Sequence, residues 1–596
     1  MIVKMKKVFV AARADHRGRL LDALRALGVV HLEPVDPKAA APEPLRQQLE
    51  RTRRARQVLS TVAPGGPTPD LDIAEAVDET LASARRIDEG RNRLSSLARE
   101  AEALRMWGEL RRSQLDELAA AGVPVAFYIV PAKDAGEVRA DLAAPLLELP
   151  GKRLLLAVVQ RQGQPSLPAS AAAIELPRRD LQSVREEARQ VDEALLADSR
   201  RLAALANLFG PLAHREHQLV AEIEYAVATA GALAGSALFA VQGWSPADEA
   251  AALQAGLGRQ GLDAAVTARE PRDDESPPTL IRYPIWARPI EGLFQILGIL
   301  PGYRELDLSA GFMIALPIFV GILIGDAGYG LLFVLLPAIF WRWATAKMGL
   351  RFTQLLMVFG VFTMVWGAMT GSYFGTSPAG IARWAGPAVG GALGRLQVFT
   401  VSADEHAFRR LMRLSFYIGA IHLSIAQLWR AAARWPRLTF LNKVGWAMFL
   451  WGMLGAVQHF VLGDELTWSQ PYFYLLIAGA FLAIMFAAPS RNLLKAFLNG
   501  LAQFPLSAIG SFSDTLSYVR LVAVGLAGAV LAANFNSLAA SAWIAAPIVL
   551  LLGHGLNIGL SMIAVFSHGV RLNVLEFSNN AGMEWSGYKY DPFANR

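Results

Sequence analysis

The chain has 596 residues, of which 53% are hydrophobic, and no cysteine, which excludes disulfides, thiol catalysis and cysteine metal sites. Its charge is uneven, because residues 1–290 hold 38 of the 57 Lys and Arg residues and 39 of the 51 Asp and Glu residues. We therefore expect a charge-rich soluble half followed by a charge-poor, basic membrane half.

The N-terminal half begins with a strand, a helix and a strand over residues 5–35, and Gly28 is the expected helix stop. The first residues contain no apolar core or cleavage site of a signal peptide, so we expect this half to stay in the cytoplasm. Residues 43–62 and 71–121 have apolar positions every three or four residues and charges of both signs. That pattern predicts an extended helical hairpin.

A second small α/β unit follows, with strands expected at 123–130, 152–160 and 171–176. Another long helix is expected at 179–232, and strands at 236–246 and 263–270 return to the first unit. The order predicts two α/β lobes joined by a coiled-coil-like rod, which together form residues 1–270. A linker rich in proline and charge, assigned to residues 271–305, separates this arm from residues 306–596.

The C-terminal half contains about eight apolar segments, centred near residues 317, 335, 363, 422, 452, 479, 520 and 560. Basic residues follow the second, fourth and sixth segments, whereas the turns after the first, fifth and seventh hold acids or no charge. This alternation places both termini in the cytoplasm. The exception is the arginine-containing loop at about 376–410, which should lie outside and is also a candidate interfacial helix.

The last two apolar segments, about 501–538 and 542–577, carry Arg520 and Arg571. Both exceed the ~20 residues that cross a hydrocarbon core, so these helices should be tilted or protrude. An arginine at mid-membrane costs roughly 2.5–3.5 kcal/mol on insertion scales and cannot lose its proton. Such residues usually mark an ion path and have a carboxylate partner. The alternative is that they snorkel, or pair with internal carboxylates only to hold the bundle together.

Polar residues accompany both arginines at helical spacing. At 100° per residue, one stripe of the second helix holds Asn557, Ser561, His568 and Arg571. A broader face of the first holds Ser513, Ser517, Arg520 and Asn534. Two polar stripes in apolar helices predict an interior seam or a wet surface that ions could follow.

Several motifs, in order, resemble one family. They are KVFVAARADHRGRLLDALRALGVVHLEPV at the start, GWSP (243–246), PPT (277–279), GILIGDAGYGLL (321–332), WGAMTGSYFG (366–375), IGAIHLSIAQ (418–427), SDTLSYVRLVAVGLA (513–527), HGVRLNVLEF (568–577) and YDPF (590–593). Together they are similar to the large membrane subunit of rotary V/A-type ATPases, called subunit I in prokaryotes and subunit a in eukaryotes.

The resemblance implies a polytopic α-helical membrane protein with about eight transmembrane helices, the last two long and tilted. It adds an N-terminal cytoplasmic α/β domain of two lobes joined by long coiled-coil helices. The implied function is the stator ion channel of the rotary ATPase, with two offset half-channels that exchange H⁺ or Na⁺ with carboxylates of a rotating proteolipid c/K ring. A fixed cation favours the ionised ring carboxylate. Arg520 would be the main barrier charge, Arg571 its neighbour and His568 a lining residue.

The implied partners are this ring, peripheral stalk subunits of the E/G type, the central-stalk cap region of the V1/A1 sector and the lipid bilayer of the cell inner (plasma) membrane. The chain departs from the family pattern at Gly528 and Ser561, where several relatives have a histidine and a glutamate. Asp514, His422, Glu576 and water are the candidates to replace these groups. His422 could equally form an interhelical hydrogen bond, and Asp326 in GDAGYG is expected to cap a turn.

No nucleotide or metal motif accompanies these features. Gly151-Lys152 lacks the glycine spacing of a P-loop, and neither HExxH nor a carboxylate-rich cluster occurs. We therefore expect no cofactor, no ATP site in this chain and no nucleic-acid partner. Two other classes of function are alternatives. A secondary transporter would have matched broken helices in two halves, which are not seen, and a membrane scaffold would leave both arginines replaceable.

Overall fold

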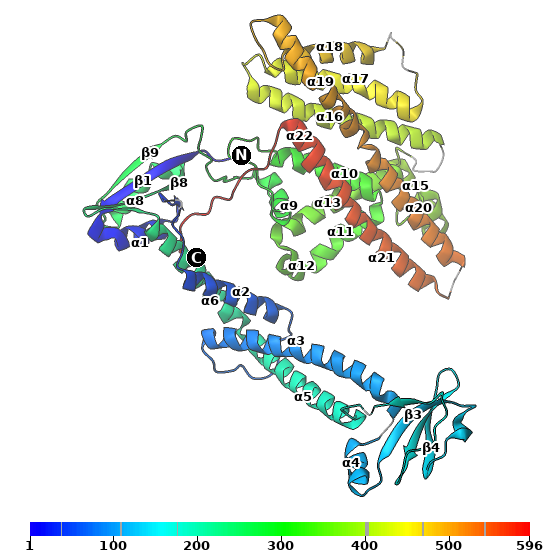
Figure 1. The fold of residues 1–596 in the computed structure, drawn as a ribbon. Helices are drawn as coiled ribbons and strands as arrows, with labels where there is room; N and C mark the ends of the chain where they lie inside the picture. Colours follow the sequence, from blue (N-terminus) through cyan, green and yellow to red (C-terminus); the bar gives the residue numbers. More distant parts are fainter. Residues whose placement is uncertain are drawn as a thin grey trace.

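The computed structural model describes residues 1–36, 38–107, 110–175, 177–399, 405–465, 467, 470–541 and 544–595. Figure 1 shows a long arm built from the first half of the chain and a helical bundle built from the second. Both chain ends lie on the side of the bundle where the arm begins, close to the sheet that contains β1 (Met5–Arg13).

The proximal sheet, next to the bundle, joins both ends of the arm sequence. Its antiparallel order is β2–β8–β1–β9, with β7 paired to β8. The strands are β1 (Met5–Arg13), β2 (His31–Glu33), β7 (Leu233–Ala234), β8 (Leu238–Pro246) and β9 (Ala264–Arg269). Gly243 of the GWSP motif must be glycine, because a Cβ there would lie 2.3 Å from the carbonyl oxygen of His31. The strands expected at both ends of the arm are confirmed.

Helices cover one face of the proximal sheet, where alternate strand residues are apolar. They are α1 (Arg17–Leu27), α7 (Ala247–Ala250) and α8 (Leu253–Arg259). Val8, Val10 and Leu24 are fully or almost fully buried there. Gly28 ends α1 in the left-handed conformation (φ 63°), as expected of a glycine helix stop.

The distal sheet lies at the far end of the arm (Figure 1) and has the antiparallel order β4–β5–β3–β6. Its strands are β3 (Val125–Pro131), β4 (Leu142–Leu149), β5 (Arg153–Val159) and β6 (Ala172–Ile174), and α4 (Arg112–Ala120) precedes them. Sequence analysis missed β4. This edge strand is largely exposed, contains Pro145 and has a register shift between Pro145 and Leu147, so it lacks a clear alternating pattern.

Four helices form the rod between the sheets: α2 (Glu43–Ser60), α3 (Ile73–Leu104), α5 (Leu181–Leu205) and α6 (Phe209–Ala230). α3 packs along α5, and α2 packs along α6. The single helix expected at 179–232 is two helices, separated by a short 3₁₀ turn at Ala206–Leu208.

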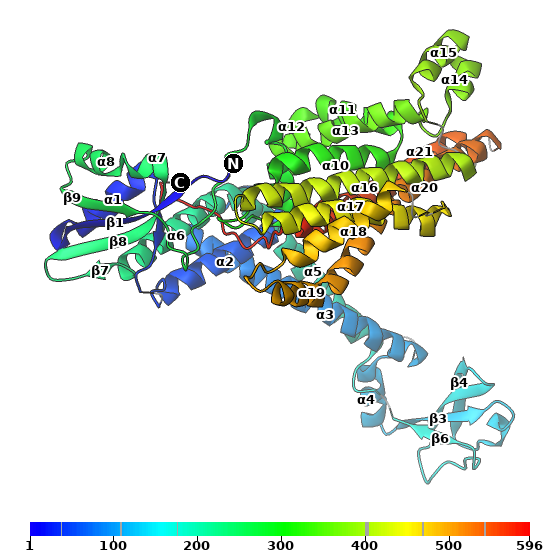
Figure 2. The same cartoon turned by 90° about the horizontal axis from the view of Figure 1, so that it is seen from above.

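The bundle follows α9 (Ile290–Leu297), which packs on α13. Its helices are α10 (Ser309–Ile324), α11 (Ala327–Ile339), α12 (Trp341–Met348), α13 (Leu350–Thr370), α14 (Pro378–Ala385), α15 (Pro387–Leu396), α16 (Glu405–Arg434), α17 (Phe440–Leu462), α18 (Pro471–Met485), α19 (Leu493–Leu516), α20 (Val519–Ser541), α21 (Ala546–Ala564) and α22 (Ser578–Ala581). The loop at 376–410 contains α14 and α15, which project at the end away from the chain termini (Figure 2), while residues 400–404 fall outside the described part.

Within the described residues, five helices are long and apolar enough to cross a membrane, or six if α11 and α12, bent by 94°, form one span. The expected number of about eight also counted two shorter apolar helices and took α11 and α12 as one span. The segments centred near 317 and 479 are the apolar helices α10 and α18, which have only 16 and 15 residues. The segment with Arg520 is longer than expected, because α19 and α20 form one 49-residue stretch, Leu493–Ser541. The segment with Arg571, Ala546–Ala581, has the expected length of 36 residues but lies four residues further along the chain.

The C-terminal tail returns from the bundle to the proximal sheet (Figure 1). Thr279 N donates to Tyr588 O (2.8 Å), and Tyr590 N donates to Thr279 O (3.1 Å). Further along, the Tyr590 hydroxyl donates to Val29 O (2.8 Å), and Phe593 is buried against the sheet. The tail therefore ties the last membrane helix to the arm.

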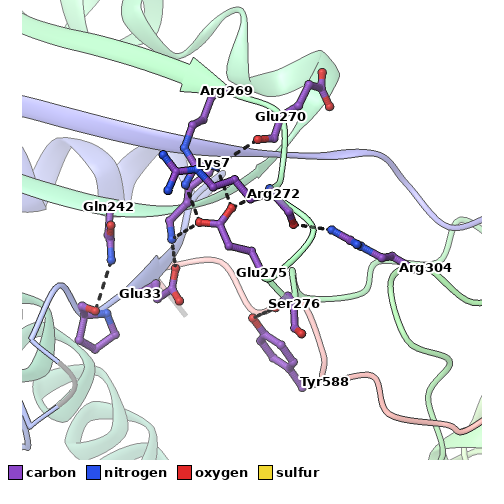
Figure 3. A network of polar contacts seen from close by, with 11 residues as sticks. Lys7, Glu33, Gln242, Arg269, Glu270, Arg272, Glu275, Ser276, Arg304 and Tyr588 are labelled. Carbon is purple, nitrogen blue, oxygen red and sulfur yellow. Dashed lines mark hydrogen bonds and ion pairs between the residues drawn. The ribbon is translucent and has the colours of Figure 1, made fainter.

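Charged side chains hold the linker against the proximal sheet (Figure 3). The Glu275 carboxylate accepts hydrogen bonds from Arg269 Nη1 (2.7 Å) and Lys7 Nζ (3.0 Å), and Lys7 also pairs with Glu33 (3.1 Å). The hydrogen bond from the Arg269 guanidinium is the main reason that the pKa of Glu275 is well below its ordinary value. Glu275 is therefore an anion at neutral pH and fixes the start of the linker.

Candidate functional site

The two arginines share one buried carboxylate. Arg520 Nη2 lies 3.3 Å from Glu576 Oε1, and Arg571 Nε lies 3.5 Å from the same oxygen. The Glu576 side chain is 5% exposed, whereas those of Arg520 and Arg571 are 27% and 52% exposed. These three groups taken alone therefore carry one excess positive charge, and the two cations lie toward the outside of the bundle.

The backbone winding explains how Arg571 and Glu576 meet. Residues five apart in an α-helix point about 140° apart. After α21, however, the chain forms two π-helical segments, Val565–Val570 and Leu572–Phe577. A π-helix bonds residue i to residue i+5, which places Glu576 on the same face as Arg571. The expected pairing of the arginines with a carboxylate thus depends on winding that a 100° periodicity does not describe.

Amide side chains extend the cluster toward α16 and α19. Asn580 Nδ2 donates to Asp514 Oδ2 (2.9 Å) and to Glu576 O (2.7 Å), while Asn580 Oδ1 accepts from Gln427 Nε2 (2.8 Å). Asp514 and Glu576, both expected as replacement lining groups, are thus joined through Asn580. Sequence analysis missed Asn580 and Gln427, although Gln427 lies inside the quoted IGAIHLSIAQ motif.

The helices that carry the arginines form an open face of the bundle. In the most apolar part of α19–α20, only 28% is buried inside the chain, and the same share holds for α21 with its continuation. The corresponding share for α16 is 61%. The large apolar residues exposed on these helices include Leu506, Ile509, Val530, Leu551, Leu556, Leu560 and Ile563. This face needs lipid or another apolar surface to cover it.

The other expected lining residues are scattered. The Ser517 hydroxyl donates to Ser513 O (2.9 Å) within its own helix, and Asn534 is exposed. Ser561 is buried. His568 has a buried Nδ1 with no hydrogen-bond partner among the described residues. Of this group, only His568 presents an unused polar atom near the arginines.

His422 lies inside the bundle, away from the arginine cluster's open side. Its Nδ1 is 2.7 Å from the Tyr518 hydroxyl, and its ring stacks on Phe577 with centroids 4.2 Å apart. The side chain is buried. This geometry matches the interhelical hydrogen bond that is the alternative to a channel role for His422.

A second polar cluster lies toward the other end of the same helix pair. His554 contacts the Tyr329 hydroxyl through Nδ1 (2.6 Å) and Asn536 Oδ1 through Nε2 (3.1 Å). Asn557, an expected lining residue, donates from Nδ2 to the Tyr329 hydroxyl (3.0 Å) and to Gly528 O (2.9 Å). His554 lies one turn before Asn557, so the polar stripe could have included it, but sequence analysis did not.

Asp326 fixes the turn beside this second cluster. Its carboxylate accepts hydrogen bonds from the backbone N–H groups of Gly328, Tyr329, Phe374 and Gly375, at 2.8–3.2 Å, and from the Ser372 hydroxyl (2.6 Å). The expected capping role of Asp326 is confirmed. In the part of the chain that the structure describes, no three His, Asp or Glu side chains gather as metal ligands.

Comparison with known proteins gives full-length relatives. V-type ATP synthase subunit I of Borreliella burgdorferi is 27% identical over 630 residues, covering 100% of this chain and 99% of the relative. The chain resembles subunit I of V/A-type ATP synthases. Subunit I 1 of the V-type ATP synthase of Treponema pallidum is 28% identical over 650 residues, covering 100% of both chains. The A-type ATP synthase subunit I of Methanocaldococcus jannaschii is 25% identical over 60% of this chain and 55% of its own length.

The resemblance inferred from the motifs is thus confirmed by relatives in three organisms. No family model matches the chain. A crystal structure of the cytoplasmic N-terminal domain of subunit I, homolog of subunit a, of V-ATPase aligns with 44% of this chain and all of that chain. Its identity is 17% and its TM-score is 0.19, too low to support any argument about fold.

Proposed function

We propose that this chain is the stator ion-channel subunit of a V/A-type rotary ATPase. The observation that supports this most is the pair of arginines that share the single Glu576 carboxylate on an open apolar face. Both arginines contact the same Glu576 oxygen, so a positive charge remains at this contact that an acid from another subunit would neutralise. A carboxylate on a rotating proteolipid ring would supply it each time a ring subunit passes.

The fixed charge would act on the passing acid in two ways. Attraction to a permanent cation favours the ionised carboxylate, so the acid would release its H⁺ or Na⁺ as it reaches the arginines. The same cation would repel an ion moving straight from one half-channel to the other. Arg520, the less exposed arginine, would be the main barrier and Arg571 its neighbour.

The remaining parts would hold this channel still while the ring turns. In this proposal, residues 1–270 form a cytoplasmic stator arm that binds peripheral stalk subunits and the cap of the central stalk. Residues 271–305 link the arm to the ion-translocation domain, residues 306–596, in the cell inner membrane with both termini cytoplasmic. The charged rod and the tail tied to the proximal sheet suit a part that carries mechanical load.

The proposal is tested by Arg520→Ala in the complete ATPase reconstituted in lipid vesicles. We expect ATP-driven ion pumping to be abolished while the complex still assembles. Arg342, an exposed arginine at the start of α12, provides the control Arg342→Ala, which should pump normally. Normal pumping by Arg520→Ala would defeat the channel function.

A further inference from the structure

The cluster of Tyr329, His554, Asn536 and Asn557 has no part in the arginine site. His554 precedes Arg571 by 17 residues and Asn536 follows Arg520 by 16, so at 1.5 Å per residue each lies roughly 25 Å along its helix from its arginine. Asp514 and Asn580 lie on the opposite side of the arginines along the chain. The two polar clusters therefore flank the arginines from opposite ends of the helix pair.

The hydrogen bonds of His554 fit both the neutral and the charged imidazole without movement of heavy atoms. In the neutral ring, Nε2–H donates to Asn536 Oδ1, and Nδ1 accepts from the Tyr329 hydroxyl. When Nδ1 gains a proton, it donates to the Tyr329 oxygen instead. Only the hydroxyl hydrogen of Tyr329 has to rotate.

The protonated form is held less firmly than the neutral form. The Tyr329 oxygen already accepts from Asn557 Nδ2, so it would then accept two hydrogen bonds. Its own hydrogen would have no acceptor among the contacts of the described residues. Losing one hydrogen bond on protonation keeps the proton exchangeable, which suits a group that loads and releases protons.

The groups that face His554 favour a proton over a metal cation. From the packed elements these are the Tyr329 hydroxyl, the Asn536 amide, the Phe374 ring edge and, beyond Tyr329, the Asp326 carboxylate. Both Asp326 oxygens already accept hydrogen bonds, from five donors in all, so this carboxylate can attract a cation but has little capacity to coordinate one. Na⁺ would need carboxylate or carbonyl ligands, whereas an imidazole binds H⁺ directly.

We propose that His554, held by Tyr329 and Asn536, is the proton-exchange group at the mouth of the half-channel opposite Asp514 and Glu576, and that the transported ion is therefore H⁺. The inference rests on the proposed channel function. Nδ1 takes a proton delivered through water from the ring acid, and the N–H bond then breaks to give the proton to water outside. In this chain His554 supplies the titratable group that Gly528 and Ser561 do not.

The test uses the complete ATPase in vesicles whose nucleotide-binding sector faces outward, with the lumen pH preset over a range from acid to alkaline. The initial rate of ATP-driven acidification is measured for wild type, His554→Gln, Tyr329→Phe and the control His459→Gln, an exposed histidine at the end of α17. We expect His554→Gln to lower the rate roughly tenfold, less than a full acid–base group contributes, because water replaces part of its role. It should also lose the inflection in the dependence on lumen pH.

Tyr329→Phe should keep a shifted inflection, because the histidine remains but loses its switching partner. His459→Gln should match wild type in both readouts. A merely structural role of His554 would lower the rate without changing the shape of the pH profile. That result, a wild-type rate in His554→Gln, or pumping that requires Na⁺ would overturn the inference. Arg520→Ala in the same vesicles separates the two failures, since only its normal pumping would defeat the channel function itself.

Discussion

Arginine side chains pair with acids differently in the arm and in the last two membrane helices. In the rod, Arg201 makes two hydrogen bonds to Glu79 (2.7 and 2.9 Å), and where Arg53 and Arg56 share Glu216 they contact different oxygens of it. In the membrane bundle, Arg520 and Arg571 compete for the single oxygen Oε1 of Glu576. Each of these rod arginines thus has a carboxylate oxygen to itself, whereas the two arginines of the bundle share one.

This difference separates charge used for packing from charge used for chemistry. A partly exposed ion pair on the rod contributes about 0–1 kcal/mol to the free energy of unfolding, so many other combinations of surface residues could replace it. An excess cation inside a bilayer costs several times more and gives the fold nothing that apolar residues would not give. Its presence is explained if a passing anion completes the site.

The largest expected effect comes from removing the shared anion. Glu576→Gln would leave two arginines facing each other in a low-dielectric site, and breaking a buried ion pair costs about 3–5 kcal/mol. We expect a marked fall in the melting temperature of the purified protein in detergent, measured by scanning fluorimetry, and loss of pumping. The double variant Arg571→Gln/Glu576→Gln restores the excess charge to one and should recover part of the stability. No recovery would mean that Glu576 acts through packing.

The next effect distinguishes the two arginines. Arg571 is about twice as exposed as Arg520, so Arg571→Ala should leave the bundle intact and lower pumping by roughly tenfold, about 1.4 kcal/mol, with complete loss reserved for Arg520→Ala. Initial pumping rates normalised to the assembled complex measure this. Equal loss in both variants would contradict the unequal roles assigned from their exposure.

The sequence predicted the arm well, because its elements follow simple periods. β1 and β8 alternate, Gly28 stops α1, and the rod helices repeat apolar residues every three or four positions. β4 was not predicted, because an exposed edge strand with a proline has no such period. Hydropathy also located α10 and α18, but it does not set their lengths of 16 and 15 residues.

For the site, the sequence identified the charged residues but not their partners. Arg520 and Arg571 were named from their place in apolar segments, and Asp514 and Glu576 as candidates to replace groups that relatives carry. Glu576 contacts both arginines, and Asn580 bonds both Asp514 and the Glu576 carbonyl oxygen. Asn580 was missed because it lies beyond the apolar segment. The Arg571–Glu576 contact could not be derived, because the π-helical winding that creates it arises from packing of the last helix and has no recognised pattern in the residues.

A smaller effect is expected at the junction of arm and linker. The pKa of Glu275 is lowered in the folded chain, so its contribution to stability is present above the ordinary glutamate pKa of about 4.3 and is lost as the pH falls through the lowered value. Glu275→Gln should lower the melting temperature slightly at pH 7, because the free energy of unfolding falls by less than about 1 kcal/mol. The difference from wild type should shrink progressively below about pH 4. A difference independent of pH would contradict the ion-pair origin.

The smallest effect should come from the rod. Arg201 and Glu79 are 40% and 31% exposed, so water and salt screen most of the attraction between their charges. Arg201→Gln should change the unfolding free energy by under about 0.5 kcal/mol and leave pumping unchanged. Arg520→Ala, in contrast, should abolish pumping. Chemical denaturation with and without 1 M salt measures this, because a surface pair that matters would weaken in salt. If Arg201→Gln impaired pumping in the assembled complex, the rod charges would have to act on a stalk partner. The arginines of the arm would then also serve ion transport, and their roles would no longer differ from those of the membrane arginines.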